Sequence, residues 1–284
     1  MSTSLKLTCY LVPLYLLWGM NWVIMKVANG YFPPVLFATL RFACGSAIML
    51  LVLLINRPHL PARRLWPWIF AAGALQIAYN NVVMQLCLND LGSGLCAVLN
   101  YTMPIFTALL AHLFLAEPLS VRKCLGIALS FLGLVLIMNI ELESGAGIII
   151  FALSGALAWA ASGIIIKARL SHLDMISLTT WQMLCGAMVL CAYDLAVPQE
   201  DINWSWQACA CLAYNAILAS ALAFYLWSYI LTHMDASKAA VSILAIPGVG
   251  VMGGIIFMGE SFEIHTACGM LLILLGILVV QRSR

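Results

Sequence analysis

The sequence contains few charged residues. Asp, Glu, Lys and Arg make up only 8% of its 284 residues, whereas 64% are hydrophobic. Soluble domains carry roughly 25% charged and about 45–50% apolar residues. A water-soluble protein needs more polar groups than this to cover its surface, so the composition excludes a soluble globular protein. It predicts a protein whose main solvent is the lipid bilayer.

The sequence also lacks the motifs of several functional classes. Its cations are scattered without a basic stripe, which argues against a nucleic-acid partner. Most of the ten cysteines stand singly in apolar runs, and Cys209 and Cys211 lack the spacing of a zinc site. We therefore expect no metal, disulfide or cofactor. No span carries a metal-binding His pair, two central aspartates or a nucleophile beside a base, so we do not expect a membrane-embedded enzyme.

Long apolar runs are present instead, and breaks rich in charge, Pro, Gly or Asn divide them into ten. A bilayer core of about 30 Å needs roughly 20 residues of helix, and lipid forces each span to satisfy its own backbone hydrogen bonds. We predict an all-α polytopic membrane protein. The first run, after Lys6, resembles a signal peptide without a cleavage site and is expected to remain as a span. The predicted spans are 8–29, 33–56, 66–88, 93–115, 121–140, 147–168, 174–196, 205–230, 237–258 and 263–281.

The cations predict the orientation. With a cytoplasmic N-terminus, eleven of the thirteen Lys and Arg residues lie inside, leaving Lys26 and Arg41. This bias sets topology in most membrane proteins. We expect a multi-pass protein of the plasma membrane, in bacteria the inner membrane, with both termini cytoplasmic. The eleven are Lys6, Arg57, Arg63, Arg64, Arg122, Lys123, Lys167, Arg169, Lys238, Arg282 and Arg284.

The two halves of the chain repeat each other. Trp159, Lys167, Thr180, Cys185 and Gly186 follow Trp18, Lys26, Thr39, Cys44 and Gly45 by a constant 141 residues. Pro247, Glu260, Gly269 and Gly276 follow Pro104, Glu117, Gly126 and Gly133 by a constant 143 residues. Each half holds five predicted helices, an odd number, so the halves enter the membrane in opposite senses. We predict two inverted repeats, 1–142 and 146–284, an architecture associated with alternating access.

These residues resemble the drug/metabolite transporter superfamily in its ten-helix EamA branch. The resemblance covers nearly the whole chain and rests on Leu17-Trp18-Gly19-Met20-Asn21-Trp22, Pro33-Pro34, Leu40-Arg41-Phe42 and the repeated proline, glutamate and glycine pattern. It implies a bundle around a central cavity and export of amino acids, related metabolites or toxic analogues, or sometimes sugars and drugs. The second half departs from the pattern, with Ala160 after Trp159 and Gln182 where the first half has Arg41.

Paired helix breakers predict a hinge or cavity lining. Pro104 and Pro247 stand near the middle of spans 4 and 9, and Gly248 and Gly250 follow the second proline. A proline removes an intrahelical hydrogen bond, and the freed carbonyl must face protein or a wet cavity. Paired interruptions favour a transport site, although such prolines also simply bend helices to fit.

Polar and aromatic residues inside the spans are the candidates for substrate binding. Span 3 is richest in them, with the four amides Gln76, Asn80, Asn81 and Gln85 and with Tyr79 between them. Buried amides are costly unless paired or wetted, so they predict either a cavity wall or hydrogen bonds between helices. The further candidates, each of which could instead be a packing residue, are Trp18, Asn21, Trp22, Tyr101, Trp159, Tyr214, Tyr225 and Tyr229.

Arg41 lies about 12 Å into span 2, where an arginine must pair, reach outward or face water. A substrate carboxylate is one possible partner and a structural contact is another. No Asp or Glu stands in the middle of a span, and coupled carriers usually keep one there. We therefore predict a facilitative or weakly coupled carrier.

The preferred interpretation is a secondary transporter that exports small metabolites such as amino acids. Drugs, organic cations and nucleosides remain alternative substrates, and a channel is disfavoured because inverted repeats suggest two exchangeable faces. The expected partners are the lipid bilayer and a small-molecule substrate. Gly126 and Gly133, like Gly269 and Gly276, share a helix face and predict close helix packing within a monomer or across a homodimer.

Overall fold

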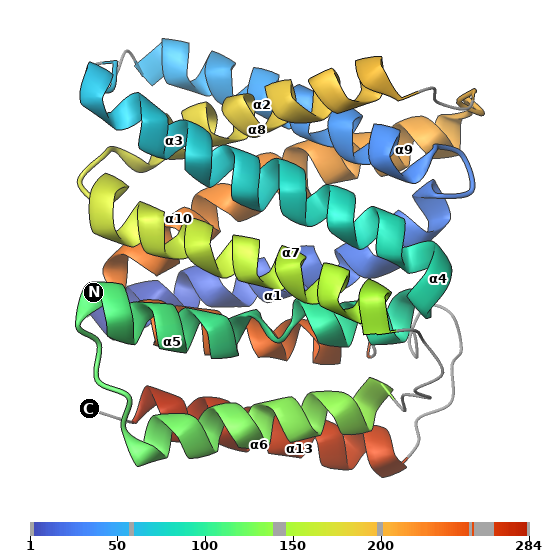
Figure 1. The fold of residues 1–284 in the computed structure, drawn as a ribbon. Coiled ribbons are helices and arrows are strands. Elements are labelled where there is room, and N and C mark those ends of the chain that lie inside the picture. The colour runs from blue at the N-terminus through green and yellow to red at the C-terminus, as the bar shows by residue number, and fades with distance from the viewer. Residues whose placement is uncertain are drawn as a thin grey trace.

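The computed structural model describes residues 3–56, 60–138, 146–197, 201–249, 252 and 264–282. Every regular element in these segments is helical, and the helices form one bundle (Figure 1). In the first half the helices are α1 Thr3–Ala28, α2 Pro34–Asn56, α3 Trp66–Gly73, α4 Asn80–Asn100, α5 Met103–Leu115 and α6 Val121–Met138. The second half contains α7 Ala146–Ile165, α8 Met175–Ala196, α9 Trp206–Tyr214, α10 Ala223–His233, α11 Ala236–Ser242 and α13 Ile264–Gln281.

Shorter segments join some of these helices into continuous spans. The π-helical segments are η2 Ala74–Tyr79 between α3 and α4, η3 Ile166–Leu170 after α7, and η4 Asn215–Leu222 between α9 and α10. The 3-10 segments are η1 Arg63–Leu65 before α3 and η5 Ile243–Ala245 after α11. With these segments included, the chain makes the ten predicted membrane passes.

Four continuous helical segments, counted with their π-helical stretches, have the length and hydropathy of membrane spans. They are Pro34–Asn56, Ala146–Leu170, Met175–Ala196 and Trp206–His233, with mean hydropathy between 1.5 and 2.1. A local signal sets the start of one of them, because Asp174 caps α8 by accepting a hydrogen bond from the backbone amide of Ser177 at 2.9 Å. The predicted bounds of 33–56 and 174–196 differ from the observed ones by a single residue.

The structure corrects one boundary. The sequence predicted a loop between spans 3 and 4, yet the backbone stays helical to Asn100. The chain nevertheless reverses within α4. The evidence is that the Asn80 amide donates a hydrogen bond to Asn100 Oδ1 at 2.9 Å. A straight helix would separate these residues by about 30 Å. Figure 1 shows this turn at α4 and the return of the chain as α5.

The repeated glycines pack the last helix of each half against its counterpart. A Cβ on Gly126 would lie 2.7 Å from the Gly276 carbonyl oxygen, and one on Gly133 would lie 2.5 Å from that of Gly269. The 143-residue offset turns the first contact into the second, which is the signature of a two-fold relation. α6 and α13 thus meet as equivalent partners, and both chain ends lie at the same end of the bundle (Figure 1).

Candidate functional site

A cavity of about 100 Å³ lies between the two halves. It extends from the middle of the bundle toward the end opposite the termini, because Met25 is near the end of α1 whereas Met103 and Ile246 lie beside the central helix breaks. Helices from both halves contribute its walls. The lining residues are Trp18, Asn21, Met25, Arg41, Asn80, Asn81, Met84, Gln85, Cys96, Asn100, Tyr101, Met103, Trp159, Phe224, Ile243 and Ile246.

Arg41 forms one wall of the cavity, and its known partners are neutral. The guanidinium donates to Asn215 Oδ1 at 3.2 Å, to Asn81 Oδ1 at 3.3 Å and to the Met25 sulfur at 3.2 Å. Arg41 is only 7% exposed. In the described segments the ion pairs are Lys123–Glu117 and Lys238–Asp235, so no described carboxylate balances the Arg41 charge.

Several polar atoms of the lining residues are buried without a hydrogen bond in the described part of the chain. Two are donors, Arg41 Nε and Trp159 Nε1, and two are acceptors, Asn21 Oδ1 and Gln85 Oε1. Leaving such an atom unpaired costs about 1–3 kcal/mol, and native proteins keep few of them. Twelve such atoms occur among the described residues, and these four belong to the cavity lining.

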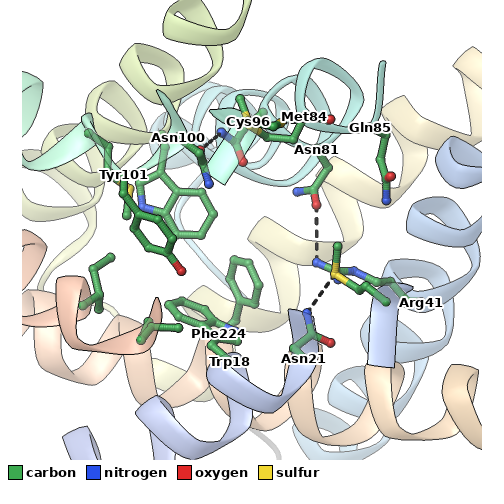
Figure 2. Close-up of a pocket in the computed structure, with 16 residues that line it drawn as sticks. Trp18, Asn21, Arg41, Asn81, Met84, Gln85, Cys96, Asn100, Tyr101 and Phe224 are labelled. Carbon is green, nitrogen blue, oxygen red and sulfur yellow. Dashed lines mark hydrogen bonds between the residues drawn. The ribbon is translucent and has the colours of Figure 1, made fainter. Parts of the chain in front are cut away.

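Aromatic side chains form the opposite wall (Figure 2). Trp18 packs edge-on against Trp159 with ring centroids 5.8 Å apart, and against Phe224 at 5.5 Å. Trp18 and Trp159 are equivalent positions of the repeat, so their contact lies close to the axis that relates the halves. Figure 2 shows Arg41, Asn21 and Asn81 on one side of the cavity and Trp18, Phe224 and Tyr101 on the other. The cavity is therefore polar and cationic at one side and aromatic at the other.

Helix breaks of both halves border the cavity at matching positions. The chain turns at Tyr101 and Thr102, and Pro104 falls in the first turn of α5. In the second half, the 3-10 segment η5 interrupts the span just before Pro247. The interruptions bring Tyr101 and Met103 from one half, and Ile243 and Ile246 from the other, to the cavity.

At the termini end of the bundle a buried polar network joins the two halves. Glu117, in the connection between α5 and α6, accepts hydrogen bonds from the backbone amides of Ala236 and Ser237 at 2.6 and 3.2 Å. The Ser237 hydroxyl donates to the same carboxylate at 2.5 Å, and the Lys123 ammonium lies 3.7 Å from it. Within the second half, Lys167 donates to the carbonyls of Leu231 and Met234. The start of α11 is thus held to the first half.

Comparison with known proteins decides the family. The sequence profile of the EamA-like transporter family matches residues 7–139 and again residues 146–282. The chain belongs to the EamA-like transporter family. It is 30% identical over 281 residues to the uncharacterized transporter YoaV of Bacillus subtilis (strain 168), covering 96% of this chain and 95% of that protein. This EamA-like chain is a membrane transporter and not an enzyme, as predicted.

More distant relatives carry further descriptions. A protein of Salmonella typhimurium described as a probable amino-acid metabolite efflux pump is 24% identical over 279 residues, covering 92% of this chain and 90% of that protein. The uncharacterized inner membrane transporter YedA of Escherichia coli K12 is also 24% identical, covering 89% and 83%. A solved crystal structure superposes with a TM-score of 0.82 over 97% of both chains at 18% identity, which shows that the EamA-like fold is shared.

The structure brings together about half of the residues that the sequence singled out. Those in the cavity wall are Trp18, Asn21, Arg41, Asn80, Asn81, Tyr101 and Trp159. The side chain of Trp22 and the whole of Gly250 lie outside the described residues. Pro104 and Pro247 are buried beside the breaks, and Gly248 faces Met270.

The remaining candidates lie away from the cavity, in contacts between helices. Gln76 accepts a 2.6 Å hydrogen bond from Gln182, and Tyr214 donates to the Leu17 carbonyl at 3.0 Å. Tyr79 is 41% exposed and hydrogen-bonds Ser154 at 2.8 Å. Tyr229 stacks on Tyr10, and Tyr225 packs against the main hydrophobic core. These positions fit the alternative of helix packing.

The cavity also contains residues that the sequence did not single out as ligands. They include the sulfur-containing side chains of Met25, Met84, Cys96 and Met103, and the ring of Phe224. Apolar residues occur on every face of a membrane helix, so nothing in the sequence separates these few from those that face lipid. Gln85, one of the four amides that the sequence analysis noted in span 3, also lines the cavity.

Proposed function

We propose that the chain is a secondary transporter that exports small metabolites, such as amino acids or related compounds, by alternating access. The observation that carries this is the cavity between the repeated halves, with Arg41 on its wall and helix breaks from both halves beside it. Such a site, built from interrupted helices at a repeat interface, is typical of secondary transporters.

The difference between the two ends of the bundle supports a carrier rather than a channel. The cavity extends toward the end opposite the termini. The Trp18, Trp159 and Phe224 rings and the Glu117 network lie between it and the termini end. One closed end is what a carrier needs in each of its two states. The expected orientation puts the termini and the Glu117 network at the cytoplasmic face.

The cavity size favours metabolites over larger compounds. A protein cavity of about 150 Å³ accommodates benzene, and this one measures about 100 Å³. A nucleoside or a drug-sized molecule requires a much larger site, of roughly 300 Å³ or more. Among the described lining residues there is no Asp or Glu, which supports transport without strong proton coupling.

Counterflow in proteoliposomes tests the proposal. Vesicles preloaded with an unlabelled amino-acid mixture are diluted into a trace of the labelled mixture. A carrier gives a transient accumulation of label above its equilibrium level, and a channel gives none. Repeating the assay with an imposed proton gradient tests coupling, because accumulation that depends strongly on the gradient would refute facilitative transport. Absence of counterflow with folded protein that binds these amino acids would refute the proposal that the chain is a carrier.

A further inference from the structure

Two helices of opposite halves run side by side from the cavity to the end of the bundle that carries the termini. α5 begins at Met103, which lines the cavity, and runs toward that end (Figure 1). α11 runs the other way, from Ala236 to Ser242, and the next residue, Ile243, also lines the cavity. The two helices pack against each other. The seam between α5 and α11 therefore joins the cavity to the termini end.

Both helices of the seam contain small, buried side chains. Ala108 and Ala111 of α5 and Ala236 and Ala239 of α11 are at most 3% exposed, and all four belong to the same hydrophobic core. A small side chain buries little apolar area, so a contact made by alanines gains less free energy than one made by leucines. The polar contacts at the termini end are therefore important for keeping the seam closed.

Glu117 follows α5 and crosses the seam at its termini end. The carboxylate accepts hydrogen bonds from the amides of Ala236 and Ser237, the first two of α11, and from the Ser237 hydroxyl. The Lys123 ammonium, 3.7 Å from the carboxylate, belongs to the same half as Glu117. When the halves separate, the Glu117 charge therefore keeps its counter-ion, and only the contacts with α11 break. Such a contact can form and break without leaving a buried charge unpaired.

The backbone before Glu117 has an unusual conformation. Ala116 has a φ of 54°, in the left-handed region, and among the described residues it is the only one besides glycine with a positive φ. Alanine is disfavoured in this region, and strain of this kind is concentrated at binding and switch sites. Here the left-handed residue ends α5 and turns the chain, and His112 Nδ1 makes a 3.0 Å hydrogen bond with the Glu117 carbonyl oxygen. The strained turn thus places the carboxylate against α11.

We propose that the α5–α11 seam is the route between the cavity and the termini end, and that Glu117 is the latch that keeps this route closed in the present conformation. In the opposite state of the carrier, the contacts of Glu117 with Ala236 and Ser237 are broken and α11 stands away from α5. This inference rests on the proposed function, because a carrier must open its closed end once in every cycle. It names where that end opens and which contacts set the balance between the two states.

Cysteine accessibility tests the seam. In a background with the ten native cysteines replaced, Ala111→Cys reports on the seam. Ala152→Cys, equally buried but in a separate hydrophobic cluster, reports on general loosening of the protein. The purified protein is treated with a small water-soluble methanethiosulfonate, and the rate of labelling is measured. A buried thiol reacts through the open state, so the rate follows the population of that state.

Variants of the latch should raise the labelling rate at Ala111→Cys. Ser237→Ala removes one hydrogen bond and leaves Lys123 paired with Glu117, so we expect labelling to be roughly three- to tenfold faster. The double variant Glu117→Gln, Lys123→Met weakens the remaining contacts without leaving a buried charge, and we expect labelling to be at least about tenfold faster. Unchanged labelling in both variants would overturn the latch.

Two further variants separate the latch from its surroundings. Asp235→Asn changes a half-exposed carboxylate beside α11 that pairs with Lys238, and it should leave the labelling rate unchanged. Ala116→Gly keeps the left-handed turn and relieves its strain, so the latch stays in place and labelling should not become faster. Faster labelling in either variant, or an equal increase at Ala152→Cys in the latch variants, contradicts the assignment.

A reversible crosslink separates this inference from the proposed function. Glu117→Cys and Ser237→Cys, combined with Lys123→Met, put two thiols in place of the latch, and a short bifunctional methanethiosulfonate joins them. We expect the crosslink to abolish counterflow and a thiol reductant to restore it. Counterflow that persists through a complete crosslink would overturn the latch and leave the carrier proposal standing. If no variant shows counterflow but labelling at Ala111→Cys still follows the latch variants, the seam assignment stands and the carrier proposal fails.

Discussion

Glu117 and Lys123 form a buried ion pair at the termini end of the bundle, with 3.7 Å between the ammonium nitrogen and Oε2. Glu117 is 8% exposed and Lys123 only 1%. Ser237 of the second half completes the group, since its hydroxyl hydrogen-bonds the carboxylate and lies 3.5 Å from the ammonium. The pair belongs to the first half, so the contact with Ser237 holds the halves together beside the closed end of the cavity.

We expect Glu117→Ala to destabilise the protein strongly. It leaves the Lys123 ammonium buried without its carboxylate and removes the acceptors of the Ala236 and Ser237 amides. Breaking a buried pair in this way costs roughly 3–5 kcal/mol. The measurement is thermal unfolding in detergent, and the double variant Glu117→Ala, Lys123→Met should recover part of the loss because it removes the orphaned charge.

An exposed ion pair at the same end provides the matched control. The Lys238 ammonium lies 3.2 Å from the Asp235 carboxylate, with the aspartate half exposed. Exposed pairs contribute about 0–1 kcal/mol, so Asp235→Asn should hardly change the unfolding temperature. A loss as large as that of Glu117→Ala would show that charge at this end, and not burial, determines the effect.

The repeated glycines lead to a second prediction. A Cβ on Gly276 would lie 2.4 Å from the Gly126 carbonyl oxygen and 2.2 Å from the Ser130 hydroxyl. Because backbone cannot move aside cheaply, Gly276→Ala should separate α6 from α13 and lower the unfolding temperature. Gly147 has no neighbour within 4 Å of an added Cβ, so Gly147→Ala is the control and should be neutral or slightly stabilising. Equal behaviour of the two variants would contradict the close packing of α6 on α13.

A third prediction compares Trp18 with its equivalent, Trp159. Trp18 Nε1 donates to the Ala219 carbonyl in η4 at 3.0 Å, whereas Trp159 Nε1 has no partner in the described segments. Trp18→Phe should therefore lower the free energy of unfolding by about 0.5–1.5 kcal/mol, the net value of one hydrogen bond. Trp159→Phe loses ring packing as Trp18→Phe does, but it loses no hydrogen bond, so it should destabilise the protein less. Chemical unfolding of the two variants in parallel measures the difference, and an equal loss of stability would contradict a contribution from the Trp18–Ala219 hydrogen bond.

Much of the fold follows from the sequence, because lipid imposes simple rules. Continuous apolar runs must be helices of bilayer length. Most predicted bounds that fall on described residues agree with the helices to within a few residues, whereas the end of span 237–258 lies outside the described residues. The helical turn inside α4 could not be predicted in the same way. It depends on contacts such as Asn80 with Asn100 and Met84 with Cys96, which exist only once the chain has folded back. The same holds for the π-helical segments, which no local residue pattern marks.

The site was only partly predictable, for a related reason. A buried arginine or amide is costly in lipid, so Arg41 and Asn80 had to face protein or a cavity. The sequence could not decide between these two environments, and Gln76 shows the difference, since it contacts Gln182 and not the cavity. Tyr229 is similar, because its stacking on Tyr10 depends on how α10 is rotated against α1.

The orientation of the bundle gives the last prediction. Asn203 and Ser171 are both exposed, and they lie at opposite ends of the bundle, because α8 runs from one to the other. In a background with the ten cysteines replaced, we expect Asn203→Cys to react with a membrane-impermeant maleimide on intact cells. Ser171→Cys, at the end that carries the termini, should react only after permeabilisation. The cation distribution requires this result, since positive residues stay in the cytoplasm. Labelling of Ser171→Cys alone on intact cells would place the Glu117 network outside the cell. Labelling of both variants would show that α8 does not cross the membrane.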